Sequence, residues 1–267
     1  MTLPTTETLL LREDGPFLHV TLNRPEARNA MSLTMVKELM AVFTAVADNT
    51  AIRAVVLRGA GGHFCAGGDI KDMAGARARL ASGDKNAFFD LNRLFGEMLT
   101  MANQLPQVLV TVSEGAVLGG GFGLACISDV ALATEDAQFG LPETGLGVIP
   151  AQIAPFVVQR IGLTQGRRLM LTGARFNGSE AARLGLIHEA VASAELDTQL
   201  AATLKQIRRC APHANRVTKQ LVLSVGEQPL TTLLDQAAAD FAAAVASTEG
   251  AEGTMAFVQK RLPSWAE

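Results

Sequence analysis

The segment LGGGFGLACISDV, Leu118–Val130, decides much of the fold because it places glycines directly before an apolar run. Three consecutive glycines follow Leu118, and a fourth, Gly123, comes after one phenylalanine. The first turn of a helix leaves backbone N–H groups without partners and carries the positive end of the helix dipole. The segment therefore predicts a buried helix that begins at a loop whose backbone can approach another group closely.

Strand and helix patterns alternate on both sides of this segment. Strands are expected at 17–23, where apolar and polar residues alternate, and at 54–59, 107–115 and within 129–143. Helices are expected over 86–105 and directly after Ser32, which is a residue type favoured at the N-cap. Strands separated by long helices favour parallel pairing, so we expect an α/β core.

The pattern changes after about residue 191, where only helical periodicity remains. The ranges 193–210, 213–226 and 229–247 each predict a helix. An apolar stripe runs along the last one and consists of Leu230, Leu233, Leu234, Ala238, Phe241 and Val245. Short helices bury little apolar surface alone, so the stripe needs the core or another subunit. We expect a core of residues 1–195 and a helical region of residues 196–267.

Composition excludes several classes of protein. A net charge of −3 argues against a nucleic acid partner, since phosphate binding favours a basic face. No apolar run approaches the roughly 20 residues of a membrane span, and the first residues do not resemble a secretory signal. Three widely spaced cysteines, Cys65, Cys126 and Cys210, suggest a reducing compartment rather than disulfides. We therefore expect a cytoplasmic protein with no membrane partner.

Two glycine-rich segments have the character of a binding loop. They are HFCAGGDI, His63–Ile70, and LGGGFG, at 118–123. Either one alone is more often a simple turn, but two in one chain can supply two convergent backbone N–H groups, as in an oxyanion hole. Their spacing fits neither the dinucleotide pattern, because residue 124 is leucine, nor the phosphate-loop pattern, and no G-x-S-x-G elbow is present.

Glu143 follows Pro142 in a largely apolar stretch. A carboxyl group among apolar neighbours has a raised pKa, which suits a proton donor or acceptor near neutral pH. Taken alone, such a glutamate is more often a solvated loop residue. The four histidines show no metal-ligand spacing, so no metal site is expected; they are His19, His63, His188 and His213.

Four motifs together resemble the enoyl-CoA hydratase/isomerase (crotonase) family. They are LNRPEARNAMS at 22–32, FCAGGDIKDM at 64–73, LGGGFGLACISDVALATEDAQFGLPETGLGVIP at 118–150 and RIGLTQGRRLMLTG at 160–173. The match extends from about residue 7 to FVQKRLPSW at 257–265. The resemblance implies a spiral of β-β-α turns and a C-terminal helical region that forms trimers, often paired into hexamers. It also implies an acyl-CoA thioester substrate, with no cofactor beyond the coenzyme A of that substrate.

Site residues follow from the resemblance by motif position. The thioester oxygen would bind the backbone N–H groups of Gly68 and Gly120, and Glu143 would be the acid/base. Contacts with the substrate and its coenzyme A are implied at Ala27, Arg28, Ala66, Gly67, Asp69, Ile70, Gly123, Phe257 and Lys260. The last two belong to a tail that, in the family, often reaches the site of a neighbouring subunit.

The chain departs from the family pattern at Gly123. Ordinary enoyl-CoA hydratases hold the added water with two glutamates; the second matches Glu143, but Gly123 stands in place of the first. The combination of GGGFG with IPAQIAPFVVQRIG at 149–162 resembles hydratases of branched glutaconyl-CoA thioesters. The favoured substrate is isohexenylglutaconyl-CoA of acyclic terpene breakdown, and 3-methylglutaconyl-CoA of leucine breakdown comes next. A glutamate at 123 would repel the substrate's own carboxylate, and glycine would leave room for the branch.

Other activities stay open at this point. A Δ3-Δ2-enoyl-CoA isomerase can work with Glu143 alone, and a non-catalytic acyl-CoA-binding protein would need no acid/base at all. An oxyanion hole also serves thioesterases and dehalogenases. Gln152 and Glu114 are candidates for holding the water, because they are near the motifs in sequence.

Overall fold

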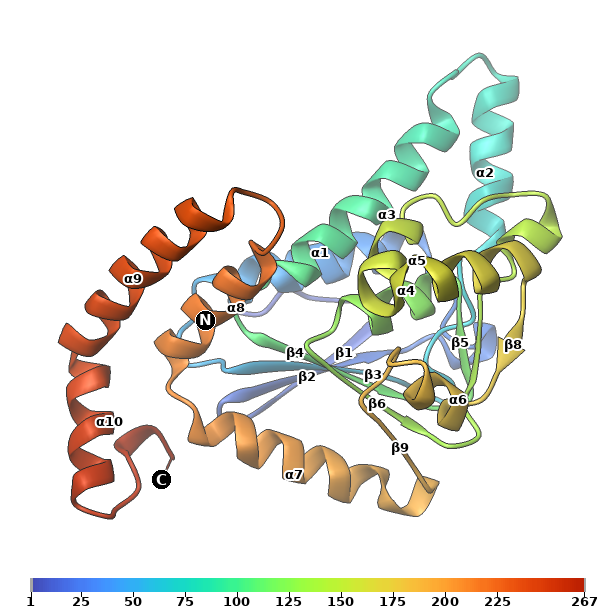
Figure 1. Ribbon diagram of the computed structural model, residues 1–267. Coiled ribbons are helices and arrows are strands. Elements are labelled where there is room, and N and C mark those ends of the chain that lie inside the picture. Colours follow the sequence, from blue (N-terminus) through green and yellow to red (C-terminus); the bar gives the residue numbers. More distant parts are fainter. Residues whose placement is uncertain (1, 267) are drawn as a thin grey trace.

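The computed structural model describes residues 2–266 and consists of two sheets surrounded by helices (Figure 1). The larger sheet has the order β1 (Leu9–Asp14), β2 (Phe17–Leu22), β3 (Ala54–Gly59), β4 (Val108–Ser113), β6 (Val130–Thr134) and β9 (Glu189–Val191). The smaller sheet has the order β5 (Ala116–Leu118), β7 (Gln138–Gly140) and β8 (Arg175–Phe176). Strands β2 to β9 of the larger sheet pair in parallel, which confirms the expected α/β core.

The chain repeatedly passes from the larger sheet to the smaller one and then into a helix. The core helices are α1 (Leu33–Ala47), α2 (Ile70–Ala81), α3 (Ala87–Asn103), α4 (Gly120–Ile127), α5 (Ala154–Thr172) and α6 (Gly178–Arg183). β4 leads to β5 and α4, and β6 leads to β7 and α5. After β3, Cys65 makes a single bridge with Val117 of β5 before α2 begins. This succession is the spiral of β-β-α turns that the family resemblance implied.

Helices cover both faces of the larger sheet. On one face α1 buries the stripe Met35, Val36, Leu39, Val42, Phe43 and Val46, and Ser32 caps this helix as expected. On the other face lies α7 (Leu196–Arg209), which buries Leu196, Leu200, Leu204 and Ile207 against strand residues such as Val56 and Val110. The boundary expected at residue 196 falls at the first residue of α7, and this helix packs directly on the core.

The last three helices extend from one end of the sheet (Figure 1, orange to red). They are α8 (Pro212–Leu223), α9 (Leu230–Ala246) and α10 (Thr248–Val258). Lys219 of α8 donates to the carboxylate of Asp129 at 2.6 Å and holds that helix on the core. In the expected stripe of α9, Leu233 is buried, whereas Leu230 and Phe241 are 68% and 71% exposed.

Several elements differ from the sequence expectation, among them β1, β7 and α10, and α5, α6, β5, β8 and β9 were not predicted. β1 was not predicted because only Leu9 of this strand is buried, so it lacks a regular alternation. The single strand expected within 129–143 is two short strands, β6 and β7, in different sheets. α10 was not separated from α9, because Ser247 ends one helix and caps the next. Within residues 2–266, no helix has the length and apolarity required to cross a membrane.

Candidate active site

Three chain segments meet where the two sheets join the helices. The Leu118 N–H donates to the Cys65 carbonyl at 2.9 Å, and the Gly119 N–H donates to the Gly140 carbonyl at 3.1 Å. The first bond joins the two glycine-rich loops, and the second joins them to the strand that leads to Glu143. The structure therefore brings together the three motifs that the sequence singled out.

Glycine is required at this junction by both backbone angles and space. Gly67 has a φ of +103° and Gly119 a φ of +47°, which side chains rarely tolerate. A methyl group added at Gly119 would lie 2.9 Å from Glu143 Oε1 and 3.4 Å from the Gly67 Cα atom. One added at Gly121 would lie 2.7 Å from the Cys65 Cβ atom. The glycines thus let the loops close on each other and bring the Glu143 carboxyl group against the start of α4.

Neither the Gly68 N–H group nor the Gly120 N–H group at this junction has an acceptor within residues 2–266. Gly120 is the first residue of α4, where an N–H cannot bond within the helix and the helix dipole is positive. Gly68 directly precedes Asp69, the N-cap of α2. Two unpaired donors on adjoining loops are the components of an oxyanion hole.

Glu143 begins a short 3-10 helix, Glu143–Leu146, and is half-buried. Burial raises the pKa of its carboxyl group, and a hydrogen bond from its own backbone N–H lowers the pKa only in part. Its Oε2 atom is buried without a hydrogen-bond partner in the described part of the chain. Such a carboxyl group can exchange a proton more readily near neutral pH than an exposed glutamate.

The residues expected to contact coenzyme A divide into two groups. Ala27 and Arg28 lie beside Ala66, whose N–H donates to the Arg28 carbonyl at 3.0 Å, and Ile70 is 83% exposed at the start of α2. Phe257, in contrast, lies on α10, which Figure 1 places at the opposite end of the molecule from α2, and Lys260 follows two residues after that helix ends. A single chain does not bring this second group to the site.

Gly123 lies one turn into α4 and is buried. A methyl group there would lie 3.3 Å from Ile153 Cγ1 and 3.5 Å from Leu99 Cδ1. The expectation that glycine leaves an open space is therefore not met, because Ile153 fills the space beside Gly123. Its side chain gives this side of the site an apolar wall in place of a carboxylate.

The two residues considered for holding the water have other partners. Glu114 forms an ion pair with Arg58 at 3.1 Å. The Gln152 amide donates to Asn92 Oδ1 of α3 at 3.1 Å. Glu114 therefore forms an ion pair at the carboxyl ends of β3 and β4, and Gln152 connects the loop before α5 to α3.

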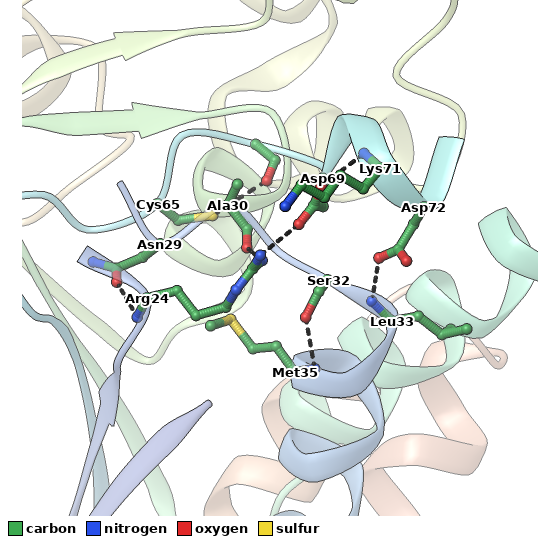
Figure 2. Close-up of polar contacts among 11 residues, drawn as sticks. Arg24, Asn29, Ala30, Ser32, Leu33, Met35, Cys65, Asp69, Lys71 and Asp72 are labelled. Atoms are coloured by element: carbon green, nitrogen blue, oxygen red, sulfur yellow. Dashed lines mark hydrogen bonds and ion pairs between the residues drawn. The ribbon is translucent and has the colours of Figure 1, made fainter. Parts of the chain in front are cut away.

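Sequence reasoning missed Arg24. Its guanidinium forms an ion pair with Asp69 at 2.7 Å and donates to the Ala30 carbonyl at 2.6 Å (Figure 2). A signal existed, because an aspartate in the otherwise apolar segment FCAGGDI requires a cation or several donors when it is buried. In residues 2–266, no group of three or more His, Cys, Asp or Glu side chains is arranged to hold a metal ion.

Comparisons with known proteins agree with this geometry. The enoyl-CoA hydratase/isomerase family model matches residues 13–267. The structure of Pseudomonas aeruginosa AtuE is 63% identical, with a TM-score of 0.94, and the match covers 98% of this chain and 100% of that one. The probable enoyl-CoA hydratase echA8 of Mycobacterium tuberculosis is 33% identical over 98% of both chains. The mevalonyl-coenzyme A hydratase sidH of Aspergillus fumigatus is 30% identical over 98% of this chain and 96% of that one. The chain belongs to the enoyl-CoA hydratase/isomerase (crotonase) family and is a hydro-lyase-type enzyme that acts on acyl-CoA thioesters.

Proposed function

We propose that this enzyme adds water to a branched, glutaconyl-type 2-enoyl-CoA, with Glu143 as the acid/base and the Gly68 and Gly120 N–H groups as the oxyanion hole. Isohexenylglutaconyl-CoA of acyclic terpene catabolism is the favoured substrate, and 3-methylglutaconyl-CoA of leucine catabolism is the next. The observation that carries the proposal is the Glu143 carboxyl group beside the Gly68 and Gly120 N–H groups: Oε2 is buried, and within residues 2–266 neither it nor the two donors have a hydrogen-bond partner.

One carboxyl group can complete the hydration. Glu143 as a carboxylate takes a proton from water while the hydroxide bonds to the β-carbon, and the electron pair of the double bond moves to the thioester oxygen as an enolate. The Gly68 and Gly120 donors stabilise that negative charge, and removing one such donor costs about 10²–10³ in rate in well-studied enzymes. Glu143, now protonated, returns its proton to the α-carbon, so water is added and the carboxylate is regenerated.

Two features support a branched substrate. Ile153 and Leu99 give the Gly123 side of the site an apolar wall, which suits a hydrocarbon branch better than a bound water. Position 123 also brings no negative charge close to a substrate that carries its own carboxylate. Mevalonyl-CoA, for which the Aspergillus relative is named, is likewise branched at its β-carbon.

A turnover assay by mass spectrometry tests the proposal. The purified enzyme would receive crotonyl-CoA, 3-methylglutaconyl-CoA and isohexenylglutaconyl-CoA in parallel. We expect one added water on a glutaconyl thioester and little on crotonyl-CoA. If crotonyl-CoA is hydrated as fast as both glutaconyl thioesters, the substrate assignment is wrong.

A second function, Δ3-Δ2-enoyl-CoA isomerisation, is favoured by the absence of a carboxylate at Gly123, because a single glutamate can move a proton between two carbons. The same assay separates the two reactions, since isomerisation leaves the mass unchanged. Binding of all three thioesters without hydration or double-bond migration would instead support a non-catalytic acyl-CoA-binding protein.

A further inference from the structure

The ion pair between Arg24 and Asp69 lies next to the oxyanion hole without belonging to it. Its side chains are only 18% and 10% exposed. Burial acts to raise the pKa of Asp69, but the hydrogen bond from the Lys71 N–H and the Arg24 guanidinium outweigh it and lower the pKa. Asp69 is therefore ionised at neutral pH, and it forms a largely buried ion pair with the Arg24 guanidinium.

The Gly68 peptide has few other supports. Gly68 is exposed, and a methyl group added to it would find no atom within 4 Å, so the side of this residue that would carry a side chain faces open space. Its N–H group has no acceptor in the described chain, and only its neighbours are held. The Gly67 carbonyl accepts from the Met31 N–H at 2.8 Å, and the Asp69 N–H donates to the Met31 carbonyl at 3.1 Å. The position of the Gly68 donor thus depends on this bridge to Met31.

Arg24 holds the bridge from both sides (Figure 2). One nitrogen of its guanidinium binds the carbonyl of Ala30, the residue before Met31, and the other binds Asp69, the residue after Gly68. The second Asp69 oxygen accepts from the Lys71 N–H at 2.8 Å and caps α2. The two segments joined by the bridge, Ala30–Met31 and Gly68–Asp69, are therefore both bound by one planar guanidinium group. Lysine cannot make this pair of contacts in the same geometry.

We propose that Arg24 and Asp69 are positioning residues for the oxyanion hole, which fix the Gly68 N–H in the direction of the thioester oxygen. The proposal rests on the function proposed above. The pair touches no reacting atom and acts only through the Ala30–Met31 and Gly68–Asp69 backbone. Loss of the ion pair turns the Gly68 donor away from the thioester oxygen. The hydrogen bond to this oxygen is stronger in the developing enolate than in the bound substrate, so its loss lowers the rate more than it weakens binding.

The chain offers a matched control on the same helix. Asp72, one turn further along α2, accepts from the Leu33 N–H at 2.6 Å and joins α2 to α1 without touching the bridge (Figure 2). Arg24→Gln and Asp69→Asn remove the ion pair, and asparagine still serves as an N-cap. Asp72→Asn weakens a comparable hydrogen bond, which joins the start of α1 to the start of α2. Arg24→Lys keeps the charge but not the two-sided contact.

Steady-state kinetics with the substrate established by the turnover assay give the first readout. We expect kcat to fall roughly 10- to 100-fold in Arg24→Gln and Asp69→Asn with KM nearly unchanged. Complete removal of an oxyanion-hole donor lowers the rate about 10²–10³-fold, and a donor that is only displaced should lower it by less. Arg24→Lys should fall between these variants and the wild type. Because the pair acts as a unit, the double variant should lose no more than either single one. Asp72→Asn should lower the Tm but leave kcat unchanged.

A spectroscopic measurement tests the positioning role separately from the proposed oxyanion hole on which it rests. Butyryl-CoA with ¹³C at the thioester carbonyl cannot be hydrated, and its carbonyl stretch falls in frequency when the oxygen accepts hydrogen bonds. We expect a fall on binding to the wild type and to Asp72→Asn, and a smaller one on binding to Arg24→Gln and Asp69→Asn. No fall with the wild type would overturn the proposed oxyanion hole together with this inference. An equal fall in all four proteins, or kcat losses that simply add in the double variant, would overturn the positioning role alone.

Discussion

At the scale of single residues, the burial of the Glu143 carboxyl group favours its reactivity but lowers the stability of the protein at neutral pH. We propose it as the acid/base, and its buried Oε2 has no hydrogen-bond partner in residues 2–266. Burial raises its pKa, so the folded protein binds this proton more tightly than the unfolded chain does. The contribution of Glu143 to stability is therefore greatest below its ordinary pKa of 4.5 and is lost as the pH rises through the raised pKa. The residue lowers stability at neutral pH in exchange for reactivity.

Glu143→Gln tests both effects of this burial together. General acid–base groups contribute about 10²–10⁴ in rate, so we expect kcat to fall by that order while butyryl-CoA still binds. The amide carries no charge, so the variant should have a higher Tm than the wild type at pH 7, and this gain should vanish near pH 4. Wild-type kcat should fall as the pH is lowered through the raised pKa. Full activity in the variant would remove Glu143 from the mechanism.

Gly123 is the residue at which the structure changes an expectation most. Ile153 fills the space beside it, so a larger side chain must displace that isoleucine as well as add a charge. Gly123→Gln and Gly123→Glu have nearly the same shape, and comparing them isolates the charge. We expect both to lower the Tm and activity on crotonyl-CoA similarly, with Gly123→Glu losing more on a glutaconyl thioester. Equal losses on both substrates would show that only space matters at this position.

At the scale of elements, the glycine before α4 and the glycine before α2 differ in whether we expect them to tolerate a side chain. Gly119→Ala places a methyl group 2.9 Å from Glu143 Oε1 at a φ of +47°, and a residue strained in this way costs about 1–3 kcal/mol. Gly68→Ala meets no atom within 4 Å and does not have a positive φ. Chemical denaturation and kcat should both show a large loss for the first variant and little change for the second. Similar losses would mean that Gly68 needs its flexibility.

Sequence patterns predicted the elements that bury a regular apolar face. α1, with its capping Ser32 and its stripe of buried residues, and the apolar strands β3 and β4 are of this kind. β1 and β7 were missed or merged because an edge strand and a three-residue strand carry too few buried positions to show a period. α4 was predicted from its apolar composition, and all of its residues are buried.

The candidate site was predictable only where chemistry leaves a local signature. Glycine-rich loops and a glutamate in an apolar stretch do so, and the structure brings Gly67, Gly119 and Glu143 together. The contact between Gly123 and Ile153 and the ion pair between Arg24 and Asp69 join residues that are distant in the chain. Such contacts depend on how the spiral stacks its turns, which no local pattern contains.

At the scale of the whole molecule, α9 and α10 lie apart from α4, at whose start the candidate site is found (Figure 1). α9 and α10 expose large apolar residues, with Phe241 at 71% and Phe257 at 85%. An apolar surface of this kind is typical of a subunit interface. A second copy of this chain is the occupant we predict, because the tail positions implied for coenzyme A contact cannot reach the site of their own subunit.

Phe241→Asp tests this arrangement, and Leu163→Asp, at an exposed position of α5, is its control. Analytical ultracentrifugation should show a trimer or hexamer for the wild type and the control, and smaller species for Phe241→Asp, since a buried charge opposes association. If Phe257 and Lys260 complete a neighbouring site, KM for the acyl-CoA should rise in Phe241→Asp while residual kcat persists. An unchanged KM in a dissociated enzyme would place the whole coenzyme A site within one subunit. A monomeric wild type would contradict the prediction that the apolar stripe of α9 is a subunit interface.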